Sequence, residues 1–259
     1  LFRSIVDRML TSCTKKMYMT ICETETVHPV YGLLVDRYHT LWTPSKFCLD
    51  VFSKQFPAGD WRFMPLWTPT PPRAIVEAKP YTFYTIGNMV DPRKNIKMLL
   101  EAFMRLGVPN VRLLIKATCH TPVTWKLPGV VVINGLLDDA SLEDIHRNGD
   151  CYVNCSHSEG VGMGAVEAAL RDKPVIITSY GGLKEYVRTP FVVDADELVS
   201  VDQDDFLFTK DMKWGKPKLD DLVRHMRTCA EGQIKTWDHA FSKDLIGEVG
   251  PSLERSSQY

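Results

Sequence analysis

The sequence predicts an α/β protein built on a doubly wound parallel sheet with helices on both faces. From Tyr81 onward, short apolar runs bounded by turn residues alternate with longer runs whose apolar residues recur at helical spacing. Strands of a parallel sheet have this continuous apolar character because crossover helices bury both of their faces. In such sheets, ligands bind beyond the carboxyl ends of the strands.

The expected elements of this domain follow one another in a regular order, and we place the domain at residues 74–198. Strands are expected at 81–88, 111–119, 129–137, 151–156, 174–179 and 191–193. Helices are expected at 95–107, at 141–148, from a glycine-rich turn to about residue 171, and from residue 181. Ser141 is the expected N-cap of the second helix, which ends at a glycine.

The flanking segments are shorter or less regular. Residues 1–73 contain three strand-like runs, "MYMTICE", "TLWTPS" and "WRFMPLW", and a helix capped by Ser45, so they amount to about half of an α/β domain. The stretch "TPTPPR" predicts a stiff linker. In residues 199–259 we expect two closing helices, at 219–230 and 233–249, that pack back on the domain interface. The acidic run 194–207 has the composition of a loop.

Composition excludes several classes of function. The 259 residues carry 31 Lys and Arg against 32 Asp and Glu, so no overall field recruits nucleic acid or an anionic membrane. No apolar run approaches the roughly 18 to 20 residues of a transmembrane segment. Seven scattered cysteines and the lack of a signal-peptide pattern favour a reducing, cytoplasmic location. The chain does not begin with Met, which is compatible with a fragment.

The stretch "SHSEGVGMGAVEAALRDKPVII" places Glu159 and Glu167 on either side of a glycine-rich helix start. Glycines let a backbone approach a ligand closely, and a helix start offers unpaired N–H groups to a phosphate. Ionised carboxylates suit hydroxyl groups instead. The pattern therefore indicates a sugar nucleotide, and the alternative is a tight strand-to-helix turn with two surface glutamates.

A second segment, "TIGNMVDPRKNIKMLLEAF", supports the sugar nucleotide. It places Gly87 at a strand end and Arg93 and Lys94 at a helix start, and a doubly wound sheet can bring that strand end opposite the glycine-rich turn. A lysine there would neutralise a diphosphate and stabilise it as a leaving group. Taken alone, two such basic residues are more often solvated surface charges.

Residues 81–187 resemble the donor-binding domain of the retaining GT-B glycosyltransferases of glycosyltransferase family 4. The resemblance is carried by "IGNMVDPRKNIKMLLEAF" and by "SHSEGVGMGAVEAALRDKPVIITSYGGLKEYV", with its pair of glutamates, Pro-Val and Gly-Gly-x-x-Glu. "LWTPSKFCLDVF" resembles the end of the family's acceptor domain. The resemblance implies metal-independent transfer of a hexose-type sugar from a nucleoside diphosphate sugar to a glycan or other hydroxyl acceptor. It further implies retention of configuration by a front-face mechanism, without a cofactor.

Position by position, the resemblance implies that Glu159 contacts the donor sugar, Glu167 the ribose and Lys94 the diphosphate. The remaining donor-site positions implied by the resemblance are Gly87, Asn88, Arg93, Gly160, Val161, Gly162 and Met163. The four residues from Gly160 would act through their backbone.

The chain departs from the family pattern at two places. Asn88 stands where the family usually has an arginine on the diphosphate, and Arg93 is a candidate to compensate. The amino-terminal part is too short for a full acceptor domain, so the enzyme is naturally reduced, or a missing segment or partner chain completes it. In that part, Glu23 is the first candidate to reach the sugar across the cleft, and Glu25 is the second.

Two other functions stay open: a non-catalytic subunit that binds a sugar nucleotide or glycan, and a sugar-nucleotide epimerase. A metal site at Cys151, Cys155 and His157 is disfavoured, because alternate strand residues share one face and free cysteines are commonly buried. The acidic residues Asp202, Asp204 and Asp205 lack the pattern of a calcium loop. The amino-terminal aromatic residues suit core packing better than acceptor stacking, and they are Tyr38, Trp42, Trp61 and Trp67.

Overall fold

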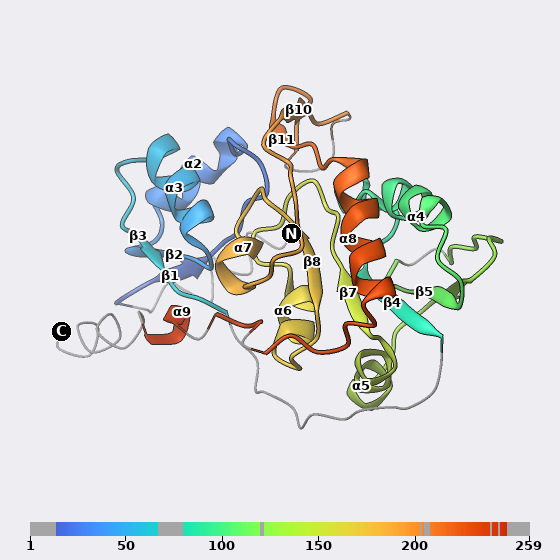
Figure 1. Ribbon diagram of the computed structural model, residues 1–259. Coiled ribbons are helices and arrows are strands. Elements are labelled where there is room, and N and C mark those ends of the chain that lie inside the picture. The colour runs from blue at the N-terminus through green and yellow to red at the C-terminus, as the bar shows by residue number, and fades with distance from the viewer. Residues whose placement is uncertain are drawn as a thin grey trace.

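A computed structural model of the chain describes residues 14–66, 80–119, 122–202, 204, 208–238, 240–242 and 244–247 (Figure 1). Its main feature is a six-stranded sheet in which every neighbouring pair of strands is parallel. The strands are β4 (Tyr81–Gly87), β5 (Val111–Ala117), β6 (Val130–Ile133), β7 (Cys151–Val153), β8 (Val175–Thr178) and β9 (Val192–Val193). All six lie where the sequence predicts strands.

The strand order β6-β5-β4-β7-β8-β9 makes the sheet doubly wound. The chain runs outward from β4 through β5 to β6, and then returns to place β7 on the other side of β4. The direction of winding therefore reverses between β4 and β7, and ligands of open α/β sheets bind at such a reversal. The predicted fold class is confirmed.

Each face of the sheet has its own hydrophobic core, because successive strand residues point to opposite faces. On one face, Phe83 packs with helices α4 (Ile96–Arg105) and α8 (Leu219–Glu231). On the other face, Tyr84 packs with helices α5 (Asp139–Asn148) and α6 (Met163–Ala169). The short helix α7 (Leu183–Tyr186) follows β8 and joins the second core.

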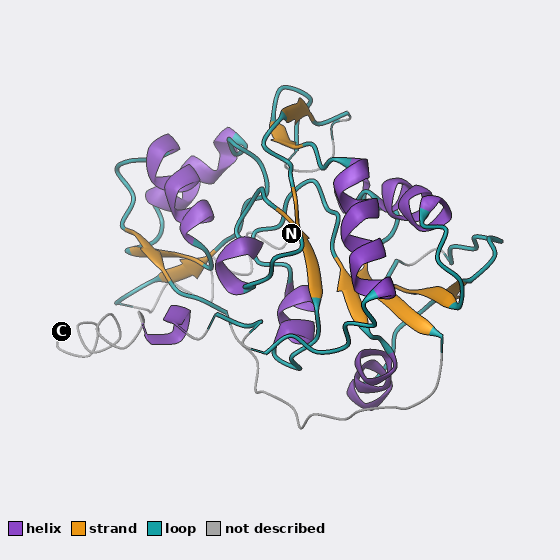
Figure 2. Cartoon of the chain, in the orientation of Figure 1, coloured by secondary structure: helices purple, strands orange, loops and turns teal. Residues whose placement is uncertain are grey.

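The amino-terminal region forms a separate, smaller sheet beside the large one (Figure 2). Its parallel strands are β1 (Met17–Met19), β2 (Thr40–Thr43) and β3 (Trp61–Phe63), and its helices are η1 (Pro29–Tyr31), α2 (Gly32–Val35) and α3 (Lys46–Gln55). The predicted cap of α3 is confirmed, since the Ser45 hydroxyl accepts a hydrogen bond from the Cys48 amide at 3.2 Å. Phe52 of this helix stacks on Trp61 with ring centroids 4.6 Å apart. Trp61 and the buried Trp42 are packing residues, as expected, whereas Trp67 and the predicted linker lie outside the described residues.

Three details differ from the sequence prediction. The N-cap of helix α5 is Asp138, three residues before the predicted Ser141, and its carboxylate accepts from the Ser141 amide at 2.8 Å. The acidic run is not all loop, because it contains β10 (Leu198–Ser200), which pairs antiparallel with β11 (Lys213–Gly215). Within the described residues of the expected last helix, α9 (Asp244–Gly247) is helical and 234–237 are irregular. Within the described residues, no helix has the length and apolar character needed to cross a membrane.

Candidate functional site

The candidate site lies where the loops after β4 and β7 meet, at the reversal of the sheet. The loop after β4 contains a short 3-10 helix, η2 (Pro92–Lys94), whose cap is Asp91: its carboxylate accepts from the Arg93 amide at 2.9 Å. Asn95 then adopts a left-handed conformation, with φ 51°, before α4 begins. This turn directs Arg93 and Lys94 toward the loop after β7. The two predicted motifs are thus brought together.

Glu159 stands at the centre of the site and is only 4% exposed. Lys94 Nζ lies 2.5 Å from its Oε1, and Arg93 Nη1 lies 2.9 Å from its Oε2. The Ser156 hydroxyl and the Asn154 amide also donate to Oε1, at 2.7 and 3.2 Å. Burial by itself would raise the pKa of Glu159, but Lys94 and Arg93 lower that pKa to about 2. Glu159 is therefore a fixed anion at neutral pH.

Arg93 holds three carboxylates together. Its guanidinium lies 2.9 Å from Glu159, 3.1 Å from Asp91 and 3.2 Å from Glu23, and it also donates to the Ser158 carbonyl at 3.0 Å. Burial is the first cause that raises the pKa of Glu23, although Arg93 opposes the shift. We refer to Glu23, Asp91, Arg93, Lys94 and Glu159 as the charge cluster.

The charge cluster contains two cations and three carboxylates when all are ionised, so it carries an excess of negative charge. Such a group does not by itself attract a diphosphate. Arg93 is bound on several sides and its side chain is 11% exposed, whereas the Lys94 side chain is 20% exposed and meets one carboxylate. A hollow lined by Lys94, Asn154 and Ser156 measures about 10 Å³, which is room for one water. Lys94 is therefore the cation of this group that can most easily change partner.

The second glutamate of the predicted pair, Glu167, lies in a different group. It extends from α6 toward α5, where its Oε2 is 3.3 Å from His146 Nε2. The other nitrogen of this buried histidine is 3.0 Å from the Tyr84 hydroxyl. The Glu167 side chain is 34% exposed, so one side of it stays open to a ligand.

The glycines of the turn stand where neighbouring side chains or the backbone conformation leave no room for a Cβ atom. A Cβ atom on Gly160 would lie 2.1 Å from Ile21 of the amino-terminal region, and one on Gly164 would lie 2.4 Å from the Tyr152 hydroxyl. Gly162 has a φ of 76°, which disfavours any side chain. Close approach of a ligand to the backbone of these glycines stays a prediction, because the surroundings of Gly160 and Gly164 show only that a side chain has no room there. Both give space to neighbouring side chains of the chain.

Within the described residues, the side chains of the other predicted donor-site positions make no hydrogen bond or ion pair with the cluster, although the Asp91 amide donates to the Asn88 carbonyl oxygen at 3.3 Å. Gly87 ends β4 beside the Lys94 side chain, where an added Cβ would lie 3.5 Å from Cε. Asn88 is exposed, and its side chain accepts from the Val90 amide at 3.3 Å. The side chains of the remaining two positions pack into the second core, and these are Val161 and Met163.

Sequence reasoning missed two residues that fix the site. Glu185, the last residue of the Gly-Gly-x-x-Glu motif, accepts from the amides of Lys46 and Phe47 at 2.7 and 2.8 Å, so it caps α3 from across the interface. His157 stacks on Trp214 with ring centroids 5.0 Å apart, which attaches the β10–β11 hairpin to the turn before Glu159. The motif was visible in the sequence, whereas the partner of His157 was not.

The discounted cysteines lie in the core, as predicted. Cys151 and Cys155 are both buried, and burial raises the pKa of the Cys155 thiol to about 12. His157 is half-buried and its Nδ1 lies 2.7 Å from the Gly215 carbonyl oxygen.

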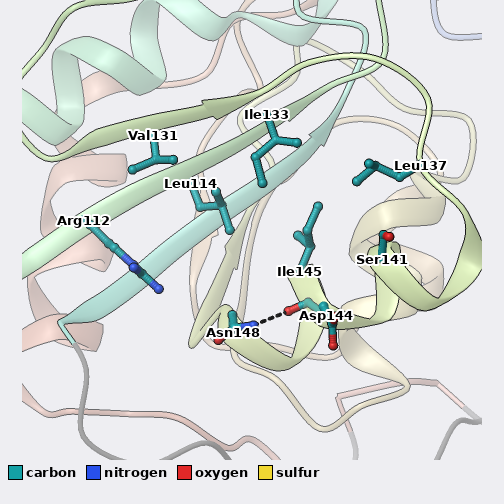
Figure 3. Close-up of a pocket in the computed structure, with 9 residues that line it drawn as sticks. All are labelled: Arg112, Leu114, Val131, Ile133, Leu137, Ser141, Asp144, Ile145 and Asn148. Carbon is teal, nitrogen blue, oxygen red and sulfur yellow. Dashed lines mark hydrogen bonds between the residues drawn. The ribbon is translucent and has the colours of Figure 1, made fainter.

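A separate hollow of about 340 Å³ lies between α5 and the outer strands β5 and β6 (Figure 3). Its wall is mostly apolar, with Leu114, Val131 and Ile133 from the strands, and Arg112 at one end. It contains none of the predicted site residues. Ser141, Asp144 and Asn148 of α5 line it as well.

Comparison with known proteins shows what the segment that contains this site is similar to. The model of the family described as "Glycosyl transferases group 1" matches residues 80–206. A search of curated proteins by sequence found no match.

Three solved structures are similar to the chain in fold. Sucrose-phosphate synthase from Thermosynechococcus elongatus superposes with a TM-score of 0.63 at 17% identity, covering 88% of this chain and 60% of that one. A TarM variant from S. aureus, in complex with Fondaparinux, alpha-GlcNAc-glycerol and UDP, gives 0.65 at 11% identity, covering 95% and 50%. The pneumococcal O-GlcNAc transferase GtfA, in complex with UDP and GlcNAc, gives 0.62 at 12% identity, covering 93% and 53%.

The chain spans between 50% and 60% of the length of these three structures. The likeness extends over both the large sheet and the amino-terminal region, since it covers 88% or more of this chain. Residues 80–206 match the model of the glycosyl transferases group 1 family, and the chain has the α/β fold of the GT-B type that these structures share.

Proposed function

We propose that this chain carries the donor site of a glycosyltransferase. In this proposal, a hexose-type sugar moves from a nucleoside diphosphate sugar to a hydroxyl of a glycan or other acceptor, with retention of configuration. The observation that carries the proposal is the meeting of Lys94 and Glu159 at the β4/β7 reversal, within the segment that matches the family. Two of the similar structures, TarM and GtfA, are complexes with UDP, which supports a nucleoside diphosphate as the ligand class.

Donor binding in this proposal requires Lys94 to change partner. The diphosphate replaces Glu159 as the ligand of the Lys94 ammonium, while Glu159 keeps Arg93, Ser156 and Asn154. These remaining donors keep Glu159 ionised, and the oxygen released by Lys94 then accepts from a hydroxyl of the donor sugar. Glu167, with its open side, binds the ribose.

The proposed chemistry is a front-face substitution. The bond between the anomeric carbon and the diphosphate breaks, and Lys94 stabilises the departing negative charge. The acceptor oxygen bonds to the same face of the sugar, and its proton passes to an oxygen of the departing phosphate. Glu159 orients the sugar and favours the positive charge that develops on its ring. Glu23 acts as a positioning residue, because it reaches the cluster through Arg93.

The cluster also favours a second candidate function, a non-catalytic subunit that binds a sugar nucleotide or glycan. Asn88 supplies no charge to a diphosphate, and Glu159 already has four protein donors. A site built in this way binds an anion weakly unless Lys94 is released.

An assay for released nucleoside diphosphate separates the two candidates. The wild-type chain is incubated with UDP-, GDP- and ADP-linked hexoses, with and without a panel of glycan acceptors. We expect release with at least one donor, and a loss of about a hundredfold or more in Lys94→Ala, as for other groups that stabilise a leaving charge. The matched control is Lys97→Ala, which removes an exposed lysine three residues further along the chain, in α4, and it should leave release unchanged.

Three other outcomes of these release and binding assays would count against the proposal or one of its parts. Equal release by Lys94→Ala and wild type would remove Lys94 from the chemistry. Binding of a sugar nucleotide without release under any condition would favour the non-catalytic subunit. If the chain neither binds nor consumes any donor, the proposal is wrong.

A further inference from the structure

Two polar contacts join α5 to α6 and the turn after it, and Glu167 takes part in both. The Arg171 guanidinium lies 2.6 Å from Glu143 of α5 and also donates to the Glu167 carbonyl oxygen at 2.6 Å. Three residues further along α5, His146 Nε2 lies 3.3 Å from Oε2 of the Glu167 side chain. The Arg171–Glu143 pair can therefore hold the helices together when the His146 contact is removed.

The hydrogen bonds of His146 assign the position of its ring proton. A carboxylate only accepts hydrogen bonds, so the nitrogen that faces Glu167, Nε2, is the one that carries the proton. In the neutral ring Nδ1 is then an acceptor, and the Tyr84 hydroxyl donates to it at 3.0 Å. Burial raises the pKa of Tyr84, so its hydroxyl keeps the proton that it donates. The three side chains form one directed chain of hydrogen bonds from β4 through α5 to α6.

Packing holds the imidazole ring of His146 in one orientation. The residue is 2% exposed, and its ring meets the Tyr84 ring edge-to-face with centroids 5.5 Å apart. Tyr84 is itself fixed by a second edge-to-face contact, to Tyr152 at 5.0 Å. A ring that is locked on both sides directs its free N–H group to one place. His146 thus provides Glu167 with a fixed hydrogen-bond donor.

The Glu167 side chain has no other restraint of this kind. It is 34% exposed, and a long side chain that is free to change rotamer loses entropy when a ligand orders it. Within the described residues, only Oε2 makes a hydrogen bond, so Oε1 is available to a ligand. The His146 contact therefore decides how well the carboxylate is prepared for binding.

We propose that His146 is the positioning residue of Glu167, and that through it the site selects a ribose over a deoxyribose. Nε2–H holds Oε2, and Oε1 accepts from a ribose hydroxyl. Because the carboxylate is ordered in advance, binding costs less entropy. A deoxyribose leaves Oε1 without its donor, which is the kind of mismatch that a polar site rejects. This inference rests on the proposed function for the ribose, and it adds the residue that prepares the site and the selection that follows.

The first test compares nucleotides that differ only in the sugar hydroxyls. UDP, GDP and ADP, and their 2′,3′-dideoxy counterparts, are titrated calorimetrically into each variant. We expect the wild type to bind at least one ribonucleotide about tenfold or more better than its dideoxy counterpart, as for a hydrogen bond to a charged group. Glu167→Ala should remove this preference.

Two substitutions of His146 separate positioning from packing. His146→Asn places an amide near the position of Nδ1, where it still meets Tyr84 but does not reach Glu167, and it should reduce the preference to less than about threefold. His146→Gln places its amide near the position of Nε2, where it can donate to Glu167, and it should keep the preference.

The control is Glu143→Gln, which weakens the other contact between the helices without touching the Glu167 carboxylate. It should lower the midpoint of unfolding in urea and leave the ribose preference unchanged. A purely structural role of His146 would instead make the preference follow stability through all variants.

The second test needs no ligand. Nitrogen-15 NMR of the histidine rings is recorded at about pH 8, and the signals of His146 are identified by their loss in His146→Asn. We expect a protonated Nε2 and an unprotonated Nδ1, with the Nε2 signal shifted in Glu167→Gln. A proton on Nδ1 would overturn the positioning role.

Failure of the inference differs from failure of the proposed function. Binding of a nucleoside diphosphate without a ribose preference, or a preference that persists in His146→Asn, would overturn the role of His146 alone. Binding of no nucleoside diphosphate to the wild type would overturn the proposed function and the ribose selection together.

Discussion

Replacement of Glu159 by glutamine tests the charge cluster through protein stability. The pKa of Glu159 is lowered from 4.5 to about 2, and a difference of one in pKa corresponds to about 1.4 kcal/mol. The carboxylate therefore contributes about 3 kcal/mol to the free energy of unfolding at neutral pH. Glutamine keeps the size of the side chain but leaves Lys94 without a buried partner.

The sign of the pH dependence follows from the direction in which the pKa moves. Because the folded-state pKa lies below the unfolded value, the stabilisation is complete above pH 4.5 and disappears as the pH falls toward 2. Urea unfolding at several pH values should show a gap between wild type and Glu159→Gln that narrows by about 1.4 kcal/mol per pH unit below 4.5.

The control for this experiment is Glu101→Gln. It removes an exposed carboxylate that is paired with Arg105 at 2.5 Å on the surface of α4, so the loss should stay below about 0.5 kcal/mol. A Glu159→Gln variant as stable as the wild type, with a gap that does not depend on pH, would refute the buried ion cluster.

Three further predictions concern residues around the site. Glu167→Ala should weaken calorimetric binding of a nucleoside diphosphate by about 1.5 to 3 kcal/mol, the range of charged hydrogen bonds; unchanged binding would mean that its only partner is His146. Glu185→Gln should lower the free energy of unfolding in urea by about 1 to 2 kcal/mol, because α3 loses an anionic cap; equal stability would show that water replaces this cap. Gly160→Ala places a methyl group against Ile21, so native-state proteolysis should cut the amino-terminal region faster, and an unchanged rate of cleavage would contradict the close packing there.

The central domain could be predicted from the sequence because its signals are local and agree with one another. Apolar strands, helical periodicity and punctuating glycines are each visible within about ten residues. The predicted N-cap of α5, Ser141, was wrong because Asp138 caps the helix, and Asp and Ser are about equally good N-cap residues. The strand β10 was missed because its pairing with β11 needs a partner thirteen or more residues away.

The site could be predicted only in part, for a physical reason. The motifs placed Lys94 and Glu159 near each other, and the structure joins them at 2.5 Å. The sequence could not show that three carboxylates would surround Arg93, because Glu23 reaches it from the loop after β1, in the amino-terminal region. It also could not show that Gly160 gives space to Ile21, since that contact forms between distant parts of the chain.

The proposed donor site depends most directly on Lys94 being the diphosphate ligand. Isothermal titration of UDP, GDP and ADP into the wild type, Lys94→Gln and the control Lys97→Gln, at low and at moderate salt, tests this claim. We predict that at least one nucleoside diphosphate binds the wild type and the control equally well, and that Lys94→Gln binds it about tenfold more weakly or worse, with less dependence on salt. Equal affinity and equal salt dependence in all three proteins would contradict the account.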